Sequence, residues 1–349
     1  MKIYYSVYDL SKEVNPYTRT LAEGIQKLDK NTAFVWGHKY FWTDEIFSCN
    51  IVHIHWPEQL LNGGHTSDDL EKRLAHIKAK GGKVVATCHN FSPHLMRAPE
   101  RVKAYQATYA QADAIIHLGE YSCNVLKEQL PTTRHVVIPH HVYDRIYTSM
   151  PSREEAVRRL KVDGSKRYVL CFGAFRNDEE RNLAIDVAKK LRANGVSVAA
   201  PGFAVINRRN NPKVKIPSVW QYIKYSLLYP NILKCRNKVA DKDVPYFYAL
   251  ADVCMIPRLE ILNSGNVPMA LLMGKCVVGP DVGNVGELLR TTGNPTFAPH
   301  EINSVVPAVR KALDMADSKG KENRNWALKN LNTDLICQKT FALYQSILL

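Results

Sequence analysis

The sequence lacks the long apolar runs that cross membranes. Of its 349 residues 46% are hydrophobic, yet no stretch of about 18 consecutive apolar residues occurs, so no transmembrane helix is expected. The N-terminal residues lack a long apolar segment and a small-residue cleavage site, and their pattern is that of a first strand, so a secreted protein is not expected. These absences predict a cytoplasmic protein.

Paired cysteine motifs are also missing. The eight cysteines are scattered singly, with no Cys-x-x-Cys. Several fall in expected strands, where a thiol packs as a small apolar group. We therefore expect the cysteines to be reduced and structural, as in the cytosol.

No Walker-type phosphate loop is present, although the formal net charge is +14. This excess of positive charge indicates what the protein can bind and says nothing of its fold. Nucleic acid, anionic lipid and phosphorylated ligands are all compatible with it. Residues 206–240 hold eight lysines and arginines, interleaved aromatic residues and no acid. This segment is either an anionic-membrane or phosphate-facing surface, or a solvated basic helix whose aromatic side chains pack on the domain.

Strand and helix patterns alternate along the chain. The expected strands are 3–7, 51–55, 83–88, 114–117 and 135–138, then 167–172, 196–199, 253–256, 276–278 and 296–297. Two long helices, 302–315 and 322–348, are expected to close the chain. Continuous apolar strands separated by helices predict parallel sheets that are covered on both faces. The pattern restarts after a polar linker at 148–166, which predicts two doubly wound α/β halves in tandem.

The most distinctive stretch is 251–289. A short apolar strand is followed by a loop with Glu260, a small polar turn, an apolar helical segment, a second buried strand, and a glycine-containing loop that ends at Glu287. Strand, polar turn and helix together point backbone N–H groups at an anion. Ser or Asn at a helix start is also an ordinary cap. The turn consists of Asn263, Ser264, Gly265 and Asn266.

Two arginines follow the first strand of the second half. Arg176 and Arg181 lie in the sequence GAFRNDEER, directly after the strand 167–172. An arginine in this position can clamp a diphosphate with two hydrogen bonds. The alternative is an ion pair with one of the acids in the same loop.

Histidines gather in the first half. His55 ends the expected strand 51–55, and His89 directly follows the expected strand 83–88. Both therefore fall at strand carboxyl ends, where an imidazole can donate a hydrogen bond to a substrate or act as a base. Tyr17 follows the loop after the first strand, on the same side. The histidine spacings fit no standard zinc site, and we expect no metal. Asp241 and Asp243 precede a helix, where acids favour its N-terminus, although two carboxylates so spaced could hold a divalent ion.

These residues together resemble the GT-B glycosyltransferases, in particular the bacterial enzymes that use nucleotide-sugar donors. The resemblance covers most of the chain. In the first half it rests on HIHWPE, TCHNFSPH and HVVIPHHVYD, and in the second on VLCFGAFRNDEERNLAIDVAKKL. The most specific match is DVPYFYALADVCMIPRLEILNSGNVPMALLMGKCVVGPDVGNVGELL.

The resemblance implies two facing Rossmann-like domains and a final helix that crosses back to the first of them. Residues 1–160 plus 331–349 would form the acceptor domain, and 161–330 the donor domain. The donor is implied to be a nucleotide-diphosphate sugar, and the acceptor a saccharide or a lipid-linked saccharide, as in surface polysaccharide biosynthesis. No resident cofactor is implied.

The resemblance also assigns roles to the candidate residues. The turn residues and the two arginines would meet the donor diphosphate, and Glu260 would approach the transferred sugar. His89 would lie near the sugar from the first domain, with Tyr17 and His55 on the acceptor side. Glu287 is a candidate for contact with the nucleotide.

One departure from the family pattern concerns Pro268. Family members with a retaining mechanism often carry two acids separated by seven residues, and here proline stands in the second position. The usual ribose contact is either missing or supplied by another group, for which Glu287 is the candidate. The loop of Glu260 favours a retaining reaction, whereas an inverting one would need a base, with His89 first and Asp9 or Glu58 in reserve.

Two other functions fit the same features. A nucleotide-sugar epimerase of this architecture would turn over its donor without an acceptor. A non-catalytic protein could bind nucleic acid or another anion through the +14 charge. The concentration of that charge in 206–240, and the lack of an RNA-binding motif, argue against a specific nucleic-acid partner. The basic segment favours peripheral association with the inner face of the cytoplasmic membrane.

Overall fold

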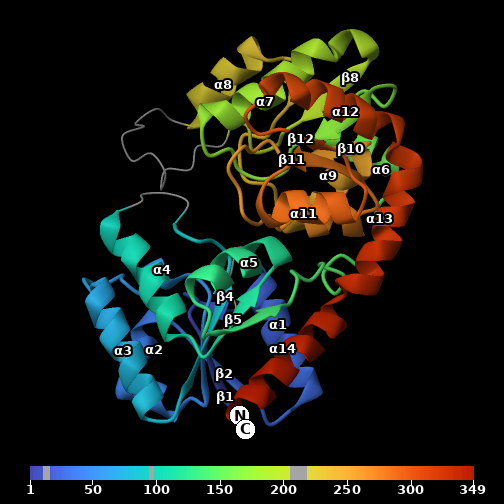
Figure 1. Ribbon diagram of the computed structural model, residues 1–349. Coiled ribbons are helices and arrows are strands. Elements are labelled where there is room, and N and C mark those ends of the chain that lie inside the picture. The colour runs from blue at the N-terminus through green and yellow to red at the C-terminus, as the bar shows by residue number, and fades with distance from the viewer. Residues whose placement is uncertain (11–15, 94–97, 205–217) are drawn as a thin grey trace. The chain divides into compact units, whose positions relative to one another are not determined.

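Two compact α/β units make up the chain in the computed structural model, which describes residues 1–10, 16–93, 98–204 and 218–349. Unit 1 comprises Met1–His141 and Leu331–Leu349, and unit 2 comprises Val142–Asn330. Each unit contains a six-stranded sheet (Figure 1). Every strand pair in both sheets is parallel. The prediction of two α/β halves with parallel sheets is therefore confirmed.

In unit 1 the sheet has the strand order β2-β1-β3-β4-β5-β6. The chain builds outward in both directions from β1, so the order reverses between β1 and β3. The strands are β1 (Lys2–Tyr5), β2 (Ala33–Trp36), β3 (Ile51–Ile54), β4 (Lys83–Cys88), β5 (Ala114–His117) and β6 (Arg134–Val137). The helices are α1 (Tyr17–Leu28), α2 (His38–Phe41), α3 (Ser67–Ala79), α4 (Pro99–Gln111), α5 (Glu120–Gln129) and α14 (Thr333–Leu348).

Helix α14 belongs to unit 1 although it follows unit 2 in the sequence. Its residues Ile336 and Leu343 join the buried core of the unit-1 sheet. The hydroxyl of Tyr344 lies 3.1 Å from that of Tyr5 on β1 and 2.5 Å from Nδ1 of His53 on β3. A buried hydrogen-bond chain thus fastens the last helix to the central strands.

Unit 2 has the strand order β12-β11-β10-β7-β8-β9. Its order reverses between β7 and β10, as in the dinucleotide-binding Rossmann fold. The strands are β7 (Arg167–Leu170), β8 (Val196–Ala199), β9 (Ile232–Leu233), β10 (Val253–Met255), β11 (Cys276–Pro280) and β12 (Thr296–Phe297). The helices are α6 (Arg153–Leu160), α7 (Asp178–Lys190), α8 (Ser218–Leu228), α9 (Val244–Leu250), α10 (Asn266–Leu272), α11 (Gly283–Thr291), α12 (Val305–Asp314) and α13 (Ala316–Asn330).

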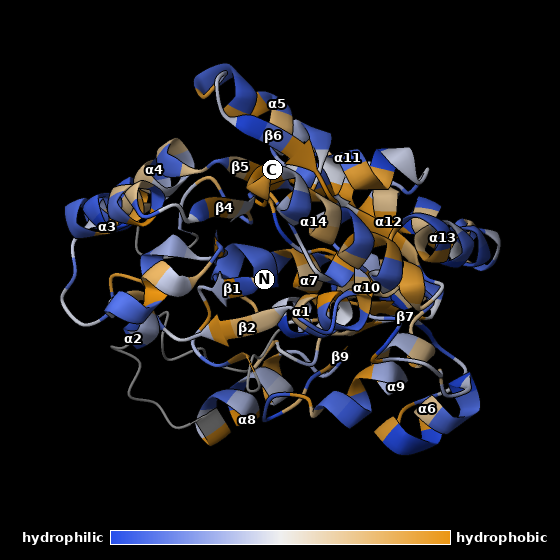
Figure 2. Cartoon of the chain, turned by 90° about the horizontal axis from the view of Figure 1, so that it is seen from below, coloured by the Kyte–Doolittle hydropathy of each residue, from blue (hydrophilic) through white to orange (hydrophobic). Residues whose placement is uncertain are grey.

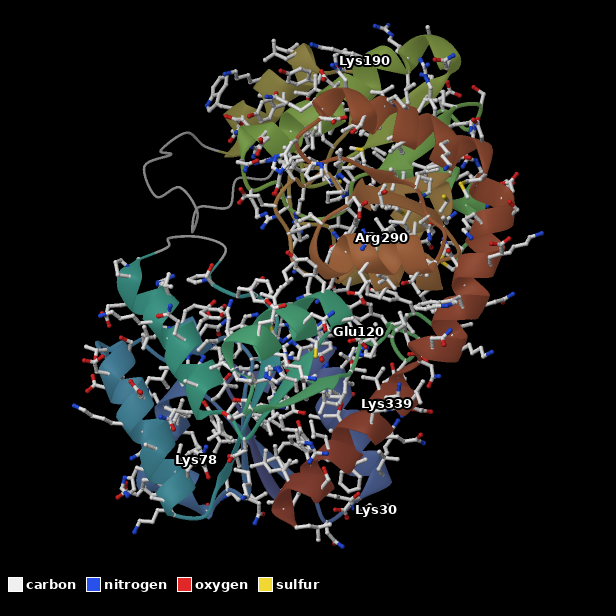
Figure 3. The ribbon with its side chains drawn as sticks, viewed as in Figure 1. Lys30, Lys78, Glu120, Lys190, Arg290 and Lys339 are labelled. Carbon is white, nitrogen blue, oxygen red and sulfur yellow. The ribbon has the colours of Figure 1, made fainter. Side chains whose placement is uncertain are left out.

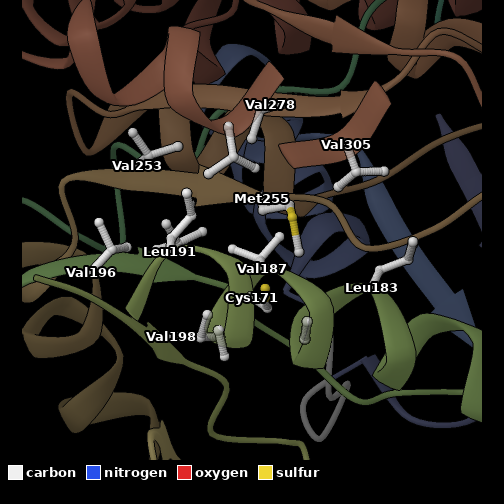
Figure 4. Close-up of a cluster of buried hydrophobic side chains, with 14 of the residues drawn as sticks. Cys171, Leu183, Val187, Leu191, Val196, Val198, Val253, Met255, Val278 and Val305 are labelled. Atoms are coloured by element: carbon white, nitrogen blue, oxygen red, sulfur yellow. The ribbon is translucent and has the colours of Figure 1, made fainter. Parts of the chain in front are cut away.

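The core of unit 2 consists of aliphatic side chains that the strands and helices bring together. Val253 and Met255 of β10 pack with Leu183 and Val187 of α7 and with Val305 of α12 (Figure 4). Burial of such side chains stabilises a fold by about 25 cal/mol per Å² of apolar surface. This packing holds the carboxyl ends of β7 and β10 in a fixed register.

Several elements differ from the sequence-based expectation. One is α11, which begins at Gly283 where a loop ending at Glu287 was expected. Strands β2 and β9 were not predicted, and both lie at or near a sheet edge. The predicted helix 322–348 is wrong, because the structure has two helices there. Asn332 ends the run by capping α14, since its side chain accepts a hydrogen bond from the Leu335 N–H at 2.9 Å.

Helix α13 is largely polar. Figure 2 colours most of α13 as hydrophilic, in keeping with its sequence ADSKGKENRNWALKN. Across the described ranges, no helix has both the length and the apolar character needed to cross a bilayer.

Candidate functional site

A set of paired charged side chains lies where the strand order of unit 2 reverses. Strands β7 and β10 are neighbours in the sheet, and the loops after their carboxyl ends carry Arg176 and Arg258 respectively. In open α/β sheets ligands bind at this position, outside the carboxyl ends of the strands. The local sequence therefore presents two guanidiniums where a ligand is expected.

The two arginines share one buried carboxylate. Glu180, only 4% exposed, lies 2.7 Å from Nε of Arg176 and 3.5 Å from Nε of Arg258 through the same oxygen. Its other oxygen accepts the Arg176 backbone N–H at 2.8 Å. Glu180 is positioned by the start of α7, where the side chain of Asn177 caps the Glu180 N–H at 2.9 Å.

Burial perturbs the charge of Arg258. Loss of solvation, with the adjacent guanidinium of Arg176 adding to it, lowers the pKa of Arg258 to about 10, while Glu180 opposes the change. A lowered arginine pKa means that the positive charge is held at an energetic cost. An anion bound here would relieve that cost. Sequence reasoning overlooked Arg258, although it follows its strand as closely as Arg176 does.

Arg181 is engaged within its own helix and with a neighbouring loop. Its Nη1 donates to the Asp178 carboxylate at 3.1 Å, and its Nε donates to the carbonyl of Phe203 at 3.3 Å. Arg181 therefore forms the ion pair with an acid of the same loop that was expected as the alternative to a diphosphate contact. Arg176 also approaches the carbonyl of exposed Glu260, at 3.4 Å from its Nη2.

The polar turn before α10 is fastened on both sides. Asn266 donates from its side chain to the carbonyl of Phe172, after β7, at 2.7 Å. Asn263 accepts from the side chain of Asn284 on α11 at 2.8 Å. Between them the Ser264 hydroxyl accepts the Asn266 N–H at 3.3 Å. These side chains hold the turn against the end of β7.

The end of β7 leaves no space beside Asn266. A Cβ on Gly173, which has φ +103°, would lie 3.1 Å from the Asn266 amide nitrogen. Gly265 precedes α10 with helical backbone angles. Helix α10 has only seven residues, and Pro268 is buried in its first turn, where proline is tolerated.

Glu287 lies on α11, half-buried. The same helix carries Arg290, which forms an ion pair with Asp281 and is labelled in Figure 3.

In unit 1, His55 and His89 follow β3 and β4 at their carboxyl ends and are in contact. Nδ1 of His55 lies 3.2 Å from Nε2 of His89. His55 is fully buried and His89 is half-buried. Burial, with a smaller contribution from His53, keeps the pKa of His55 well below its ordinary value. His55 is therefore neutral at physiological pH.

Aromatic rings surround this histidine pair. The indole of Trp56 stacks on His89, with ring centroids 4.7 Å apart and planes at 17°. Tyr17 meets His89 edge-on at 5.4 Å, and it stacks on His141 at 5.0 Å. The ring of His89 is thus held in one orientation.

The structure gives details for Glu58, one of the two reserve candidates for a base, and only a position for the other, Asp9. Burial raises the pKa of Glu58, and its Oε2 atom is buried without a hydrogen-bond partner. Asp9 follows β1 in the described part of the chain.

The basic segment is described only from residue 218 onward, and residues 206–217 lie outside the described residues. Helix α8 is anchored by Tyr225 and Tyr229, whose rings contact Phe203 at 5.2 and 5.7 Å. Its other face exposes apolar side chains, with Trp220 63% and Leu227 77% exposed. The aromatic residues therefore serve in part as core and in part as surface.

Among the described residues, no cluster of three or more His, Cys, Asp or Glu side chains is arranged to hold a metal ion. Asp243, one of the two acids before α9, pairs with Arg159 at 2.7 Å. Asp241 begins the short 3-10 turn Asp241–Asp243 that leads into α9.

No family model matches the sequence, and no curated protein matches it either. Solved structures match over nearly the whole chain. Sucrose-phosphate synthase from Thermosynechococcus elongatus is 14% identical, with a TM-score of 0.72 and coverage of 99% of this chain and 98% of that one. HepE of Anabaena in complex with UDP is also 14% identical, with a TM-score of 0.72 and coverage of 99% and 100%.

A third match is WaaG, a glycosyltransferase involved in lipopolysaccharide biosynthesis. It is 13% identical, with a TM-score of 0.65 and coverage of 98% of this chain and 99% of that one. HepE was also solved with UDP-glucose and with UDP and glucose. These structural neighbours are GT-B glycosyltransferases. With two parallel six-stranded units that match them from end to end, the chain has the GT-B fold.

Proposed function

We propose that this protein transfers a sugar from a nucleotide-diphosphate sugar to a hydroxyl group of a saccharide or a lipid-linked saccharide. The observation that carries the proposal is the pair of guanidiniums, Arg176 and Arg258, around one buried glutamate at the strand reversal of unit 2. Neighbours of the same fold that use or bind nucleotide sugars, such as HepE with UDP-glucose, support the choice of donor.

The chemistry needs charge stabilisation at the leaving group. When the glycosidic bond to the donor phosphate breaks, negative charge grows on the diphosphate, and preorganised cations lower that barrier. Burial makes the positive charge of Arg258 energetically costly. A diphosphate that neutralises this charge removes that cost and so binds more tightly. In the proposal these arginines, rather than a metal ion, stabilise the leaving group.

We further propose a retaining reaction, in which an oxygen of the departing phosphate takes the acceptor proton. Glu260 is then the group nearest the transferred sugar, and Glu287 contacts the nucleotide in place of an acid at residue 268. Replacing Glu287 by Gln should weaken nucleotide binding. Analysis of the anomeric configuration of the product by NMR decides between retention and inversion.

The test of the donor is a thermal-shift screen of nucleotide diphosphates and their sugars. A ligand at 100 times its Kd stabilises the folded protein by about 2.7 kcal/mol, which raises the Tm. Arg258→Ala should lose most of that shift. Arg290→Ala is the matched control, because it removes an arginine of the same unit that is paired with Asp281.

Three results would overturn or redirect the proposal. If no nucleotide shifts the Tm while nucleic acid does, the protein is an anion-binding protein instead. If Arg290→Ala and Arg258→Ala weaken nucleotide binding equally, the arginine pair is not the donor site. If the donor is converted without any acceptor, the protein is an epimerase and the proposal of sugar transfer is wrong.

We propose that the acceptor is lipid-linked and that the protein binds the inner face of the cytoplasmic membrane through α8. The helix exposes Trp220, Ile223 and Leu227 at intervals of three and four residues, so they form one stripe. Exposed Lys224 of the same helix and the absence of acids from 206 to 240 suit an anionic lipid surface.

Co-sedimentation with vesicles tests the membrane contact. Replacing Trp220, Ile223 and Leu227 together by Ser should abolish binding to vesicles that contain anionic phospholipid, and vesicles of neutral phospholipid should bind the unchanged protein weakly. Leu328→Ser, at an exposed leucine of α13, is the control. Equal binding of the triple variant and the control would remove α8 from the proposal.

A further inference from the structure

The contact between His55 and His89 determines where their protons lie. Nδ1 of His55 and Nε2 of His89 are 3.2 Å apart, which is hydrogen-bond distance. Because His55 is buried and its pKa lies well below the ordinary value, its ring is neutral. A neutral imidazole has one N–H donor and one lone pair, so one nitrogen of His55 donates and the other accepts.

The environment of the second nitrogen of His55 selects between the two tautomers. Its Nε2 atom is buried and has no hydrogen-bond partner. An N–H that is buried without an acceptor is less favourable than an unpaired lone pair, because the N–H loses a strong interaction with water. The proton of His55 therefore resides on Nδ1, and this N–H donates to Nε2 of His89.

The consequence for His89 follows from the same rule. Since its Nε2 accepts the bond from His55, a neutral His89 carries its own proton on Nδ1. The lone pair on Nε2 of His89 then accepts the hydrogen bond from His55, and Nδ1 of His89 is a hydrogen-bond donor. Stacking by Trp56 and the edge-on contact of Tyr17 keep the ring from turning over.

We propose that His55 is a positioning residue that fixes His89 as a hydrogen-bond donor to a sugar oxygen and prevents it from serving as a general base. This inference rests on the proposed function, because it presumes that a sugar binds beside His89. It removes the first candidate base for inversion, and the acceptor proton then passes to the departing phosphate oxygen, as the retaining route requires. The backbone N–H of His55, held by the Ser6 hydroxyl at 2.7 Å, fixes the donor in place.

Two substitutions at one position separate this role from simple packing. The side-chain nitrogen of asparagine can occupy the position of Nδ1, whereas that of glutamine corresponds to Nε2. His55→Asn therefore keeps a donor to His89, and His55→Gln removes it. Both variants remove the buried ring, so a role in packing alone predicts that they behave alike.

The first readout is the tautomer of His89 by NMR of protein labelled with ¹⁵N in the histidine rings, without any substrate. The His89 signals are assigned by their loss in His89→Asn. We expect a protonated Nδ1 and a lone pair on Nε2 in the wild type and in His55→Asn. In His55→Gln the proton should move to Nε2. A wild-type His89 protonated on Nε2 overturns the inference, even if neither variant folds.

The second readout is kinetic, with the donor found in the thermal-shift screen. His55→Gln should have a kcat about ten-fold below that of His55→Asn, which is the loss of about one hydrogen bond in the transition state, with a smaller change in KM. Equal kcat values would overturn the role in catalysis. If the wild type binds no nucleotide sugar, the proposed function fails, while the NMR result still decides the tautomer.

Discussion

At the scale of single residues, the clearest feature is the sharing of Glu180 by two arginines. Replacing Glu180 by Gln keeps the shape and removes the negative charge, leaving Arg176 and Arg258 close together without it. Breaking a buried ion pair in this way typically costs about 3–5 kcal/mol. We expect unit 2 of the variant to unfold at a correspondingly lower urea concentration.

Glu179→Gln is the control for that change. Glu179 is the exposed neighbour in the first turn of the same helix, so its substitution should alter the unfolding free energy by less than about 0.5 kcal/mol. Added pyrophosphate should stabilise the wild type and the control. A Glu180→Gln variant as stable as the control would mean that the carboxylate does not balance the two arginines.

The candidate residues were only partly predictable from sequence. Arg176 was found because it follows an apolar strand, and the same signal was present for Arg258. Hydrogen bonds between residues that are distant in the sequence could not be predicted from any local pattern. The hydrogen bond from Asn266 to the carbonyl of Phe172 joins residues 94 positions apart, and only the packing of β7 beside β10 brings them together.

At the scale of helices and strands, apolar periodicity predicted the buried elements and failed at the edges. Strand β2, with the sequence AFVW, is a short apolar run that was overlooked, and only its Phe34 is buried. Strand β9 has only two residues, too few to form a recognisable pattern. The break between α13 and α14 was missed because Asn332 was not recognised as a cap. These errors left the prediction of two halves with parallel sheets unaffected.

Helix α13 packs on the end of α10 through a glycine. A Cβ on Gly320 would lie 2.2 Å from the carbonyl oxygen of Gly274. Gly→Ala inside an exposed helix ordinarily stabilises by roughly 0.5–1 kcal/mol. Here we expect the opposite sign, a destabilisation of about 1–3 kcal/mol from overpacking, measured by chemical unfolding.

Lys321→Ala, at the next and exposed position of α13, provides the comparison. It changes helix propensity without approaching Gly274 and should be nearly neutral, within about 0.5 kcal/mol. If Gly320→Ala proved more stable than the wild type, α13 would not rest on the Gly274 backbone.

At the scale of the molecule, the two units differ in their response to acid. Only His300 of the twelve histidines lies in unit 2. In unit 1, burial lowers the pKa of His53 and of His117 to about 3 each. Unfolded histidines have a pKa of about 6.5, so below this pH the unfolded state of unit 1 binds more protons than the folded state.

The sign of the effect is therefore a loss of stability as the pH falls. Each of these histidines stabilises unit 1 fully above about pH 6.5, and its contribution falls by up to about 1.4 kcal/mol per pH unit between about pH 6.5 and 3. Hydrogen exchange, corrected for intrinsic rates, should show β3 and β5 losing protection before β7 and β10. Simultaneous loss in both units would contradict this expectation.

The return of α14 to unit 1 has a consequence for the growing chain on the ribosome. Unit 2 is continuous from Val142 to Asn330, so it can complete its core as soon as that segment has emerged. Unit 1 begins first but lacks Ile336, Leu343 and Tyr344 until α14 is made. All six of its strands are made by then, but the apolar surface that α14 covers stays exposed while a whole domain is synthesised. We therefore expect a chaperone to bind the exposed apolar surface of the nascent first unit. We also expect the second unit to reach its native state first.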